Sequence, residues 1–261
     1  MSNLDYILNI SSLSKNFGGL LAVNNCTLKI QRGSITGIIG PNGSGKSTLF
    51  NLIAGSLKPS SGKVFFNNKD ITGLPSYNLF SQGILRTFQI AHEFTNLTVL
   101  ENLMMVPSKQ SGENLINALF LRKKFENQEN EIRKKAYEVA EFLNLKHLAN
   151  EIAGNLSGGQ KKLLELGRTM MVDSKLVLLD EVGAGVNRTL LKDLGTAILR
   201  LNKEKGYTFC MIEHDMDFIS RMCNPVIVLS EGSVLFQGTS EEVKNNELVI
   251  ESYLGRSNKA D

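Results

Sequence analysis

The chain has 261 residues, of which 42% are hydrophobic and 21% charged, a composition typical of a globular protein and too apolar for a disordered one. Its 29 basic and 26 acidic residues give a net charge of +3, so we expect no nucleic-acid partner. No run approaches the ~18 apolar residues of a membrane-spanning helix, and residues 1–5 lack the pattern of a secretory signal. The cysteines have no metal-binding spacing, and Cys210, in an apolar run, is expected to be buried.

The first part of the chain predicts strands that lead into a glycine-rich turn. Four segments have the composition of short strands: 7–10, 22–30, 34–39 and 63–67. A helix is predicted over 47–54, because apolar residues recur on one face and Gly55 follows as a stop. Residues 69–71 complete an edge strand and turn.

From residue 97 to about 148 the chain becomes polar and predicts a helical subdomain. One helical face there collects five apolar residues: Ile132, Ala136, Val139, Ala140 and Leu143. Farther along, three apolar strands are expected, at 175–179, 208–212 and 225–229, with an amphipathic helix over 190–203. Strands that are apolar on both faces and alternate with helices favour an α/β fold with a largely parallel sheet.

Residues 40–47 match the phosphate-binding loop GxxxxGK[ST] in every fixed position, between an apolar strand and a helix. Glycines let backbone N–H groups turn toward phosphate oxygens, and the helix adds its positive N-terminal end. Lys46 is predicted to reach the β- and γ-phosphates of a nucleotide, and the Ser47 hydroxyl to bind Mg²⁺. Five further residues are assigned to the nucleotide: Asn42, Gly43, Ser44, Gly45 and Thr48.

Two acids follow the strand at 175–179. Asp180 and Glu181 are expected where a parallel strand reaches the ligand-binding edge of the sheet. Asp180 can hold Mg²⁺ through water, and Glu181 can polarise an attacking water. An apolar strand followed by two acids is a weak signal alone, but phosphoryl transfer needs both charge neutralisation and an oriented nucleophile, which strengthens it beside a phosphate loop.

The pentapeptide LSGGQ at 156–160 resembles the signature of ABC-type ATPases. Other motifs follow in that family's order. Gln89, in RTFQ, resembles the Q-loop glutamine, and His214, in IEHD, resembles the switch histidine. Phe17 resembles the aromatic residue that stacks on adenine, and Val23 is assigned to the same cofactor. The resemblance extends over nearly the whole chain.

This resemblance implies roles in ATP hydrolysis. Gln89 would contact Mg²⁺ or the attacking water, and His214 would hold the γ-phosphate and that water, although a histidine at a strand end can also be purely structural. Four residues would grip the ATP held by the opposite subunit: Ser157, Gly158, Gly159 and Gln160. ATP and Mg²⁺ are therefore the expected cofactors, and each site needs two subunits.

The resemblance also implies an architecture and partners. It predicts a RecA-like P-loop core with a mostly parallel sheet, an antiparallel β subdomain and an inserted helical subdomain. We expect one ABC ATPase domain over 1–261, with the ATP-binding core over 1–90 and 160–261 and the helical subdomain over about 91–159. Such a chain pairs with a copy or a paralogue and docks on transmembrane permease subunits. It is then peripheral on the cytoplasmic face of the inner membrane, and a periplasmic solute-binding protein acts indirectly.

Local stretches narrow the branch of the family. Residues 83–89, 97–103, 212–216 and 249–255 are similar to ATPases of branched-chain amino-acid importers. ATPases of urea or amide importers and of lipopolysaccharide exporters share much of this tail and stay as alternatives. An ABC ATPase of translation or DNA repair is disfavoured, because the chain has one ATPase unit and no long coiled coil. A module that binds ATP without hydrolysis is disfavoured by the catalytic residues.

Two stretches raise separate expectations. Val182 and Gly183 follow Glu181 where the family has proline, and the freer backbone leaves open how tightly hydrolysis is coupled across the dimer, but not whether ATP binds. Ile90 and Phe94 follow the Q-loop glutamine, where the family has a groove for a short permease helix. Phe94 is therefore predicted to anchor the permease. The alternative is that Phe94 is buried in the helical core, as we expect for Val99 and Leu100.

Overall fold

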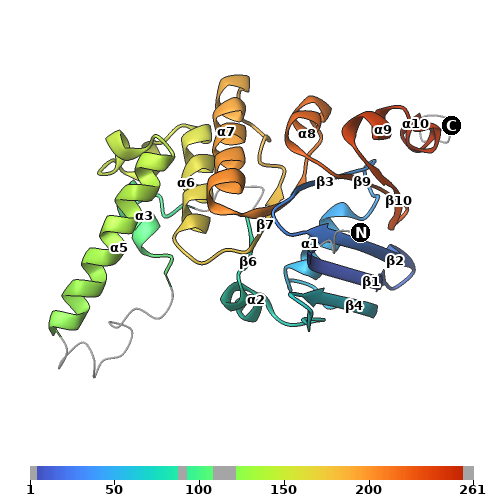
Figure 1. Cartoon of the computed structure of the whole chain (residues 1–261), viewed down its shortest axis with the longest axis horizontal. Coiled ribbons are helices and arrows are strands. Elements are labelled where there is room, and N and C mark those ends of the chain that lie inside the picture. Colours follow the sequence, from blue (N-terminus) through green and yellow to red (C-terminus); the bar gives the residue numbers. More distant parts are fainter. Residues whose placement is uncertain (1–4, 88–92, 108–121, 255–261) are drawn as a thin grey trace. The chain divides into compact units, whose positions relative to one another are not determined.

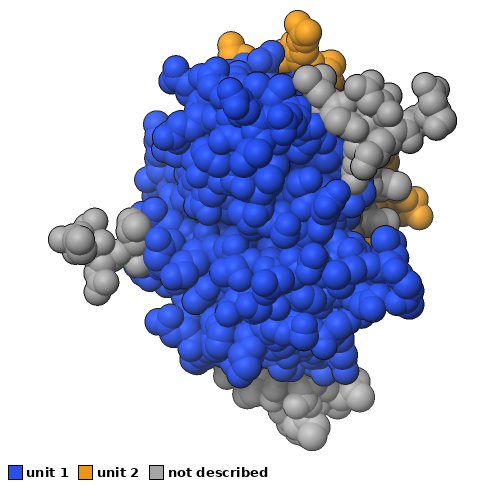
Figure 2. All heavy atoms as spheres, turned by 90° about the vertical axis from the view of Figure 1, so that its right-hand side faces the viewer, with its two compact units in different colours: residues 1–89, 175–184, 198–261 blue, residues 90–174, 185–197 orange. Residues whose placement is uncertain are grey.

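The computed structural model describes residues 5–87, 93–107 and 122–254. The chain forms two compact units, coloured separately in Figure 2. Unit 1 comprises residues 1–89, 175–184 and 198–261, and unit 2 comprises residues 90–174 and 185–197. Helix α7 (Arg188–Lys205) is divided between the units: its residues up to 197 belong to unit 2 and those from 198 on to unit 1. No helix in the described ranges is long and apolar enough to cross a bilayer.

Unit 1 contains an antiparallel sheet in the order β2-β1-β4-β5 (Figure 1). Its strands are β1 (Tyr6–Phe17), β2 (Leu20–Gln31), β4 (Ser61–Phe66) and β5 (Lys69–Asp70). β1 is longer than the predicted 7–10, because it pairs with β2 on one side and β4 on the other. Along β2, the alternation seen in the sequence points Cys26, Leu28 and Ile30 into the core.

The second sheet of unit 1 has the order β10-β9-β3-β8-β7-β6. Its strands are β3 (Ile35–Ile39), β6 (Ile84–Arg86), β7 (Leu176–Asp180), β8 (Thr208–Ile212), β9 (Val226–Ser230) and β10 (Ser233–Gly238). β10 runs antiparallel to β9 and the other strands pair in parallel, which confirms the mostly parallel sheet. β3, β7 and β8 are buried at every residue, as expected for strands covered on both faces.

Helix α1 joins the two sheets of unit 1 through one core. The helices of this unit are α1 (Lys46–Ile53), α2 (Ser76–Gln82), α8 (Met216–Met222), α9 (Ser240–Lys244) and α10 (Glu247–Leu254). Leu49, Phe50 and Ile53 of α1 belong to a hydrophobic cluster that includes residues of both sheets. Burial of each such side chain contributes roughly 1.5–3 kcal/mol. The helix that follows the phosphate loop is therefore fixed firmly in unit 1.

Unit 2 is helical. Helices α3 (Val99–Met104), α5 (Arg122–Phe142) and α6 (Gly158–Met170) pack against one another, and two short 3₁₀ turns, η2 (Lys146–Leu148) and η3 (Ala153–Asn155), connect α5 to α6 (Figure 1). The predicted apolar face of α5 is confirmed: Ala136, Val139, Ala140 and Leu143 are buried, and Ile132 is half-buried. Val99 and Leu100 are core residues, as expected. The predicted bounds of the helical subdomain, about 91–159, stay a prediction. Unit 2 extends beyond residue 159 and includes the whole of α6.

Candidate active site

The phosphate loop connects β3 to α1. At two of its positions the backbone lies so close to β2 and β9 that only glycine fits. Gly45 precedes α1 with φ of 95°, and a Cβ there would lie 2.4 Å from the carbonyl oxygen of Ala22. Gly40 has φ of 151°, and its Cβ would lie 2.1 Å from the carbonyl oxygen of Leu229. Glycine is therefore required at both positions. The loop forms a backbone cradle at a helix N-terminus, which suits phosphate.

The turn between β9 and β10 braces this loop from one side. The N–H of Gly232 donates to the carbonyl oxygen of Ser44 at 3.1 Å. The carbonyl oxygen of Gly232 accepts a hydrogen bond from the N–H of Asn24 in β2 at 2.9 Å. Through these bonds both sheets of unit 1 hold the loop in place, so its backbone is fixed independently of a ligand.

Lys46 holds its ammonium group inside the loop. Nζ donates to the carbonyl oxygens of Gly40 at 2.7 Å and Pro41 at 3.0 Å, and the residue is 6% exposed. Phosphate oxygens form stronger, charge-assisted hydrogen bonds with an ammonium group than neutral carbonyls do. The predicted contact of Lys46 with the nucleotide is thus compatible with its position.

A pocket of about 460 Å³ opens over the phosphate loop. Predicted residues that line it are Asn42, Gly43, Ser44, Gly45, Lys46, Ser47, Thr48, Glu181 and His214. Four further lining residues were not predicted: Leu20, Leu21, Ala22 and Glu231. No local motif distinguishes these four, because they come from β2 and the β9–β10 turn and meet the loop only in the fold. The volume is in the range of small-ligand sites.

Glu181 has an unusual backbone conformation at the end of β7. Its φ of 48° is rare outside glycine and is typical of functional sites. Two hydrogen bonds hold it there: its N–H donates to Ile212 at 2.9 Å, and its carbonyl oxygen accepts from Ala184 at 3.0 Å. Its Oε1 lies 3.0 Å from Nε2 of His214. The predicted catalytic acid and the predicted switch histidine are therefore adjacent.

Glu213 supports the loop that follows Glu181. Its carboxylate is buried and accepts a hydrogen bond from the N–H of Gly183 at 2.8 Å. Burial raises the pKa of Glu213 above its usual value. Val182, at the position where the family has proline, is 4% exposed and packs into the core. The question of coupling across the dimer concerns two subunits and stays open.

Asp180 ends β7 beside Arg86 of β6. Oδ2 of Asp180 accepts a hydrogen bond from Nη2 of Arg86 at 2.6 Å, and Nη1 of Arg86 donates to Oδ1 of Asn51 in α1. Sequence reasoning missed Arg86 and Asn51. Arg86 stands within the motif that contains Gln89, but its contact with Asp180 depends on the order of the strands.

Ser47 of α1 and Asp180 of β7 carry donor atoms that suit Mg²⁺, although only Ser47 is among the residues that line the pocket. Ser47 offers an exposed hydroxyl at the start of α1, and Asp180 offers a carboxylate, the oxygen ligands that Mg²⁺ prefers. In the described part of the chain, no group of three or more His, Cys, Asp or Glu side chains could hold a metal. The residues predicted to hold Mg²⁺, Ser47 and Asp180, stay a prediction.

The structure does not bring every predicted residue to the pocket. Phe17, at the end of β1, is 45% exposed, with the Lys15 ammonium 5.1 Å from its ring centroid. Val23 is 1% exposed in the core and does not line the pocket. Gln89, like Ile90 and His92, lies outside the described residues. The role of Phe17 at adenine stays a prediction that its exposure allows.

The signature residues begin helix α6 in unit 2. Ser157 caps the helix: its Oγ accepts from the N–H of Gln160 at 3.4 Å, and its own N–H donates to the Gln160 side chain at 2.9 Å. This reciprocal pair is a capping box, which S-x-x-Q predicts. Ser157 and Gly158 are exposed, while Gly159 is buried. The motif thus places an exposed helix N-terminus on unit 2, where an anion is favoured.

Phe94 lies at the surface of unit 2. It is 47% exposed, and the Arg168 guanidinium lies 5.5 Å from its ring centroid. Asn102 fixes the backbone, because its side chain accepts from the Phe94 N–H at 2.8 Å and donates to the Phe94 carbonyl at 3.1 Å. The alternative that Phe94 is a core residue is therefore wrong.

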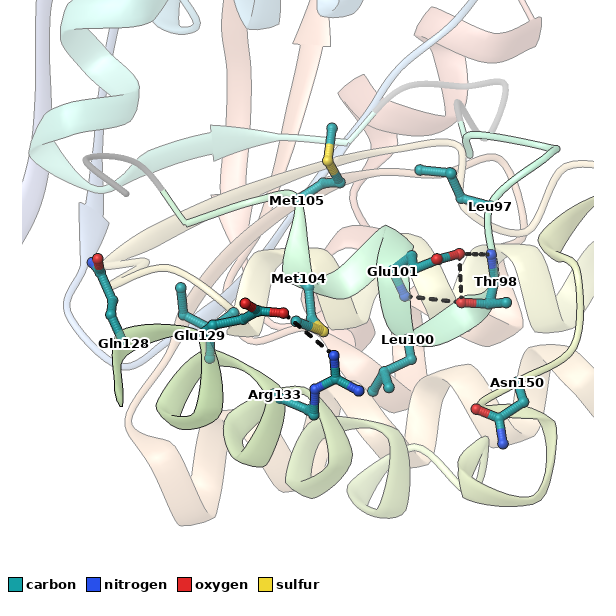
Figure 3. A pocket seen from close by; sticks show the side chains of 11 residues that line it. Leu97, Thr98, Leu100, Glu101, Met104, Met105, Gln128, Glu129, Arg133 and Asn150 are labelled. Atoms are coloured by element: carbon teal, nitrogen blue, oxygen red, sulfur yellow. Dashed lines mark hydrogen bonds and ion pairs between the residues drawn. The ribbon is translucent and has the colours of Figure 1, made fainter. Parts of the chain in front are cut away.

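A second pocket, of about 530 Å³, lies between α3 and α5 within unit 2 (Figure 3). Leu100 and Met104 are among its apolar lining residues. Its charged side chains are satisfied locally: Arg133 pairs with Glu129 at 3.4 Å, and Glu101 completes a capping box with Thr98. The hydrogen bonds from Thr98 lower the pKa of Glu101. This pocket contains none of the residues predicted to bind ATP.

The cysteines play no part in these sites. All three are free and buried, which confirms the expectation for Cys210. Burial raises the pKa of Cys210 and raises that of Cys26 to about 12, so neither thiol is ionised at neutral pH. His147 is exposed at the surface of unit 2.

Comparison with known sequences gives a consistent result. Residues 23–184 match the family model described as ABC transporter, and residues 233–257 match the one described as branched-chain amino acid ATP-binding cassette transporter. The LivG protein of Archaeoglobus fulgidus is 43% identical over 249 residues, covering 95% of each chain. The high-affinity branched-chain amino acid transport ATP-binding protein BraF of Pseudomonas aeruginosa is 37% identical over 251 residues, covering 96% of this chain and 98% of its own.

Solved structures extend this similarity to the fold. An ATP-binding cassette of an ABC transporter in its ADP conformation has 38% identity and a TM-score of 0.82, covering 96% of this chain and 99% of its own. A dimeric bacterial ABC transporter cassette has 26% identity and a TM-score of 0.71, covering 89% of this chain and 98% of its own. The chain therefore belongs to the ABC transporter family, as one of its ATP-binding cassette ATPases.

Proposed function

We propose that this chain is the ATP-hydrolysing subunit of an ABC importer for branched-chain amino acids. The observation that carries the proposal is the pocket that combines the phosphate loop with the adjacent Glu181 and His214. A cradle for phosphates, a carboxylate and an imidazole are the groups that phosphoryl transfer to water requires.

The residues of unit 1 take the following roles. The backbone of the phosphate loop and Lys46 bind the β- and γ-phosphates, and Ser47 with Asp180 would hold Mg²⁺. When bound, Mg²⁺ supplies charge neutralisation at the phosphates. Glu181 accepts a proton from the attacking water, and His214 orients that carboxylate and the γ-phosphate. We assign Gln89 to the same water or metal, as the resemblance implies.

The remaining roles require partners. Ser157, Gly158, Gly159 and Gln160 complete the ATP site of a second ATPase subunit, a copy or a paralogue. The dimeric cassette among the similar structures supports such pairing. Phe94 contacts a transmembrane permease, which places the chain peripherally on the cytoplasmic face of the inner membrane. A periplasmic solute-binding protein delivers the solute. The exposure of Phe94 supports a docking role, because aromatic side chains dominate interface hot spots.

The solute is proposed from the relatives. BraF is named for branched-chain amino acid transport, and the match at residues 233–257 is to a family described with the same solute. Those residues include the whole of β10 and of α10, and Tyr253 of α10 forms a hydrogen bond with the backbone of Gly40 in the phosphate loop. The solute is thus proposed from the match of this tail and from the names of the relatives, not from the catalytic motifs.

The test is reconstitution of the chain with its permease subunits and solute-binding protein in liposomes. We expect uptake of leucine, isoleucine or valine that depends on ATP and is lost in the Glu181→Gln variant. Urea or an aliphatic amide is the comparison solute. ATP-dependent uptake of urea without uptake of leucine would support the alternative importer. ATP hydrolysis without uptake of either would contradict the proposed transport function.

A further inference from the structure

Arg86 and Asp180 form a buried ion pair beside the proposed metal site. Nη2 of Arg86 lies 2.6 Å from Oδ2 of Asp180, and their side chains are 16% and 8% exposed. The two residues come from neighbouring parallel strands, where Arg86 pairs with Leu178, two residues before Asp180. The short distance and the low exposure distinguish this pair from surface ion pairs, which contribute little.

The guanidinium group is held from a second side. Its Nη1 donates to Oδ1 of Asn51, four residues after Ser47 on α1. Its Nε is buried and has no hydrogen-bond partner among the described residues. Burial without full hydrogen bonding is unfavourable for a polar group, so the charge on Asp180 is the main interaction that retains the guanidinium here. Arg86 thus ties β6 and α1 to the metal-site aspartate.

One oxygen of Asp180 is left for a metal. Oδ2 accepts from Arg86, whereas Oδ1 accepts no hydrogen bond from any residue that the structure describes. A carboxylate with so little exposure keeps its negative charge only beside a compensating charge or hydrogen-bond donors. The guanidinium of Arg86 supplies that charge, at 2.6 Å from Oδ2.

We propose that Arg86 is the resident counterion of Asp180 and prevents the site from taking a divalent cation without nucleotide. This inference rests on the proposed role of Asp180 in the Mg²⁺ site. A cation alone meets a carboxylate that is already neutralised and a guanidinium that repels it. The phosphates of a nucleotide add enough negative charge to reverse that balance. Metal then enters the site together with ATP rather than before it.

The test measures binding of Mn²⁺, an oxygen-seeking stand-in for Mg²⁺, by loss of the free Mn²⁺ EPR signal. Wild-type protein should bind Mn²⁺ weakly alone and firmly with ADP. Arg86→Met has similar length and no charge, and should bind Mn²⁺ alone at least about tenfold more tightly than wild type. Arg86→Lys keeps the charge and should stay close to wild type. Arg32→Met, which breaks an exposed pair with Asp5, is the matched control and should change nothing.

The outcomes separate a failure of the role given to Arg86 from a failure of the proposed metal site. Tighter Mn²⁺ binding by Arg86→Met, abolished when Asp180→Asn is added, supports the counterion role. Unchanged or weaker binding of Mn²⁺ alone by Arg86→Met overturns it, while ADP-dependent binding by wild type leaves the metal site standing. If wild type fails to bind Mn²⁺ even with ADP, the metal site itself fails and the inference with it. Arg86→Gln, which keeps a neutral donor, replaces Arg86→Met if that variant does not fold, with the same expected direction.

Discussion

The imidazole Nε2 of His214 lies 3.0 Å from the carboxylate Oε1 of Glu181. The two residues follow β8 and β7, adjacent parallel strands in which Asp180 pairs with Ile212. This distance is that of a hydrogen bond between the imidazole and the carboxylate. His214 therefore fixes the direction of the carboxylate that we propose as general base.

Lys46→Ala should abolish ATP binding at useful concentrations. Loss of charge-assisted hydrogen bonds to two phosphates predicts a fall in affinity of at least about 100-fold. Lys46 also donates to the carbonyl oxygens of Gly40 and Pro41, so we expect a small loss of melting temperature rather than unfolding. Calorimetric titration with ATP is the measurement. ATP affinity within about twofold of wild type would contradict the assignment of the loop.

Ser157→Arg should leave ATP binding to its own subunit intact and block closure of the dimer. The added bulk and charge would occupy the position of the γ-phosphate contributed by the partner. Nucleotide binding and steady-state hydrolysis are measured together. Normal hydrolysis at high protein concentration would show that the signature does not complete the partner's site.

Phe94→Ala should lower permease-stimulated ATPase activity and transporter assembly. Phe94 is half-exposed, so its truncation should cost less than about 1 kcal/mol of stability, compared with roughly 3–5 kcal/mol for a buried phenylalanine. Tyr77→Ala, at an aromatic residue 73% exposed on α2, is the control that should affect neither property. Full assembly of the Phe94 variant would exclude the docking role.

Glu213→Gln should remove the part of the free energy of unfolding that wild type loses as pH rises. Burial raises the pKa of Glu213, so the folded protein keeps a proton that the unfolded chain releases. For wild type this contribution is complete below the ordinary glutamate pKa and is lost as pH rises through the raised value. Glutamine still accepts from the Gly183 N–H and carries no charge. Urea unfolding is measured between pH 4 and pH 8, at about one-unit steps. The free energy of unfolding of the variant should increase relative to that of wild type as pH rises. If the difference in the free energy of unfolding between variant and wild type is the same at every pH, the raised pKa of Glu213 is contradicted.

The sequence predicted the elements whose signals are local. β3, β7 and β8 are buried at every residue and were expected as continuous apolar runs. β10 was not predicted, because its half-buried residues show no alternation. Helices α8 and α9 are short and were missed, although Asp215 and the capping box of Thr239 with Glu242 mark where they begin.

In the site, too, residues within local motifs were predicted and residues brought together only by the fold were not. Residues 42–48, Glu181 and His214 were predicted from motifs, and the structure gathers them at one pocket. Arg86 and Asn51 could not be predicted, because Arg86 reaches Asp180 only where β6 lies beside β7, and it reaches Asn51, 35 positions away, only where α1 packs in the fold. The proposed pairing of the signature with a partner's phosphate loop concerns two subunits, so it stays a prediction.

The central claim is that Glu181 is the general base of an ATPase. Single-turnover hydrolysis of ATP by wild type and by Glu181→Gln tests it most directly, because glutamine keeps the shape of the side chain and cannot accept the proton. The account predicts unchanged ATP affinity and a hydrolysis rate about 10²–10⁴-fold lower, with an ATP-bound dimer accumulating in the variant. Hydrolysis at the wild-type rate, with the variant monomeric in the presence of ATP and Mg²⁺, would contradict it.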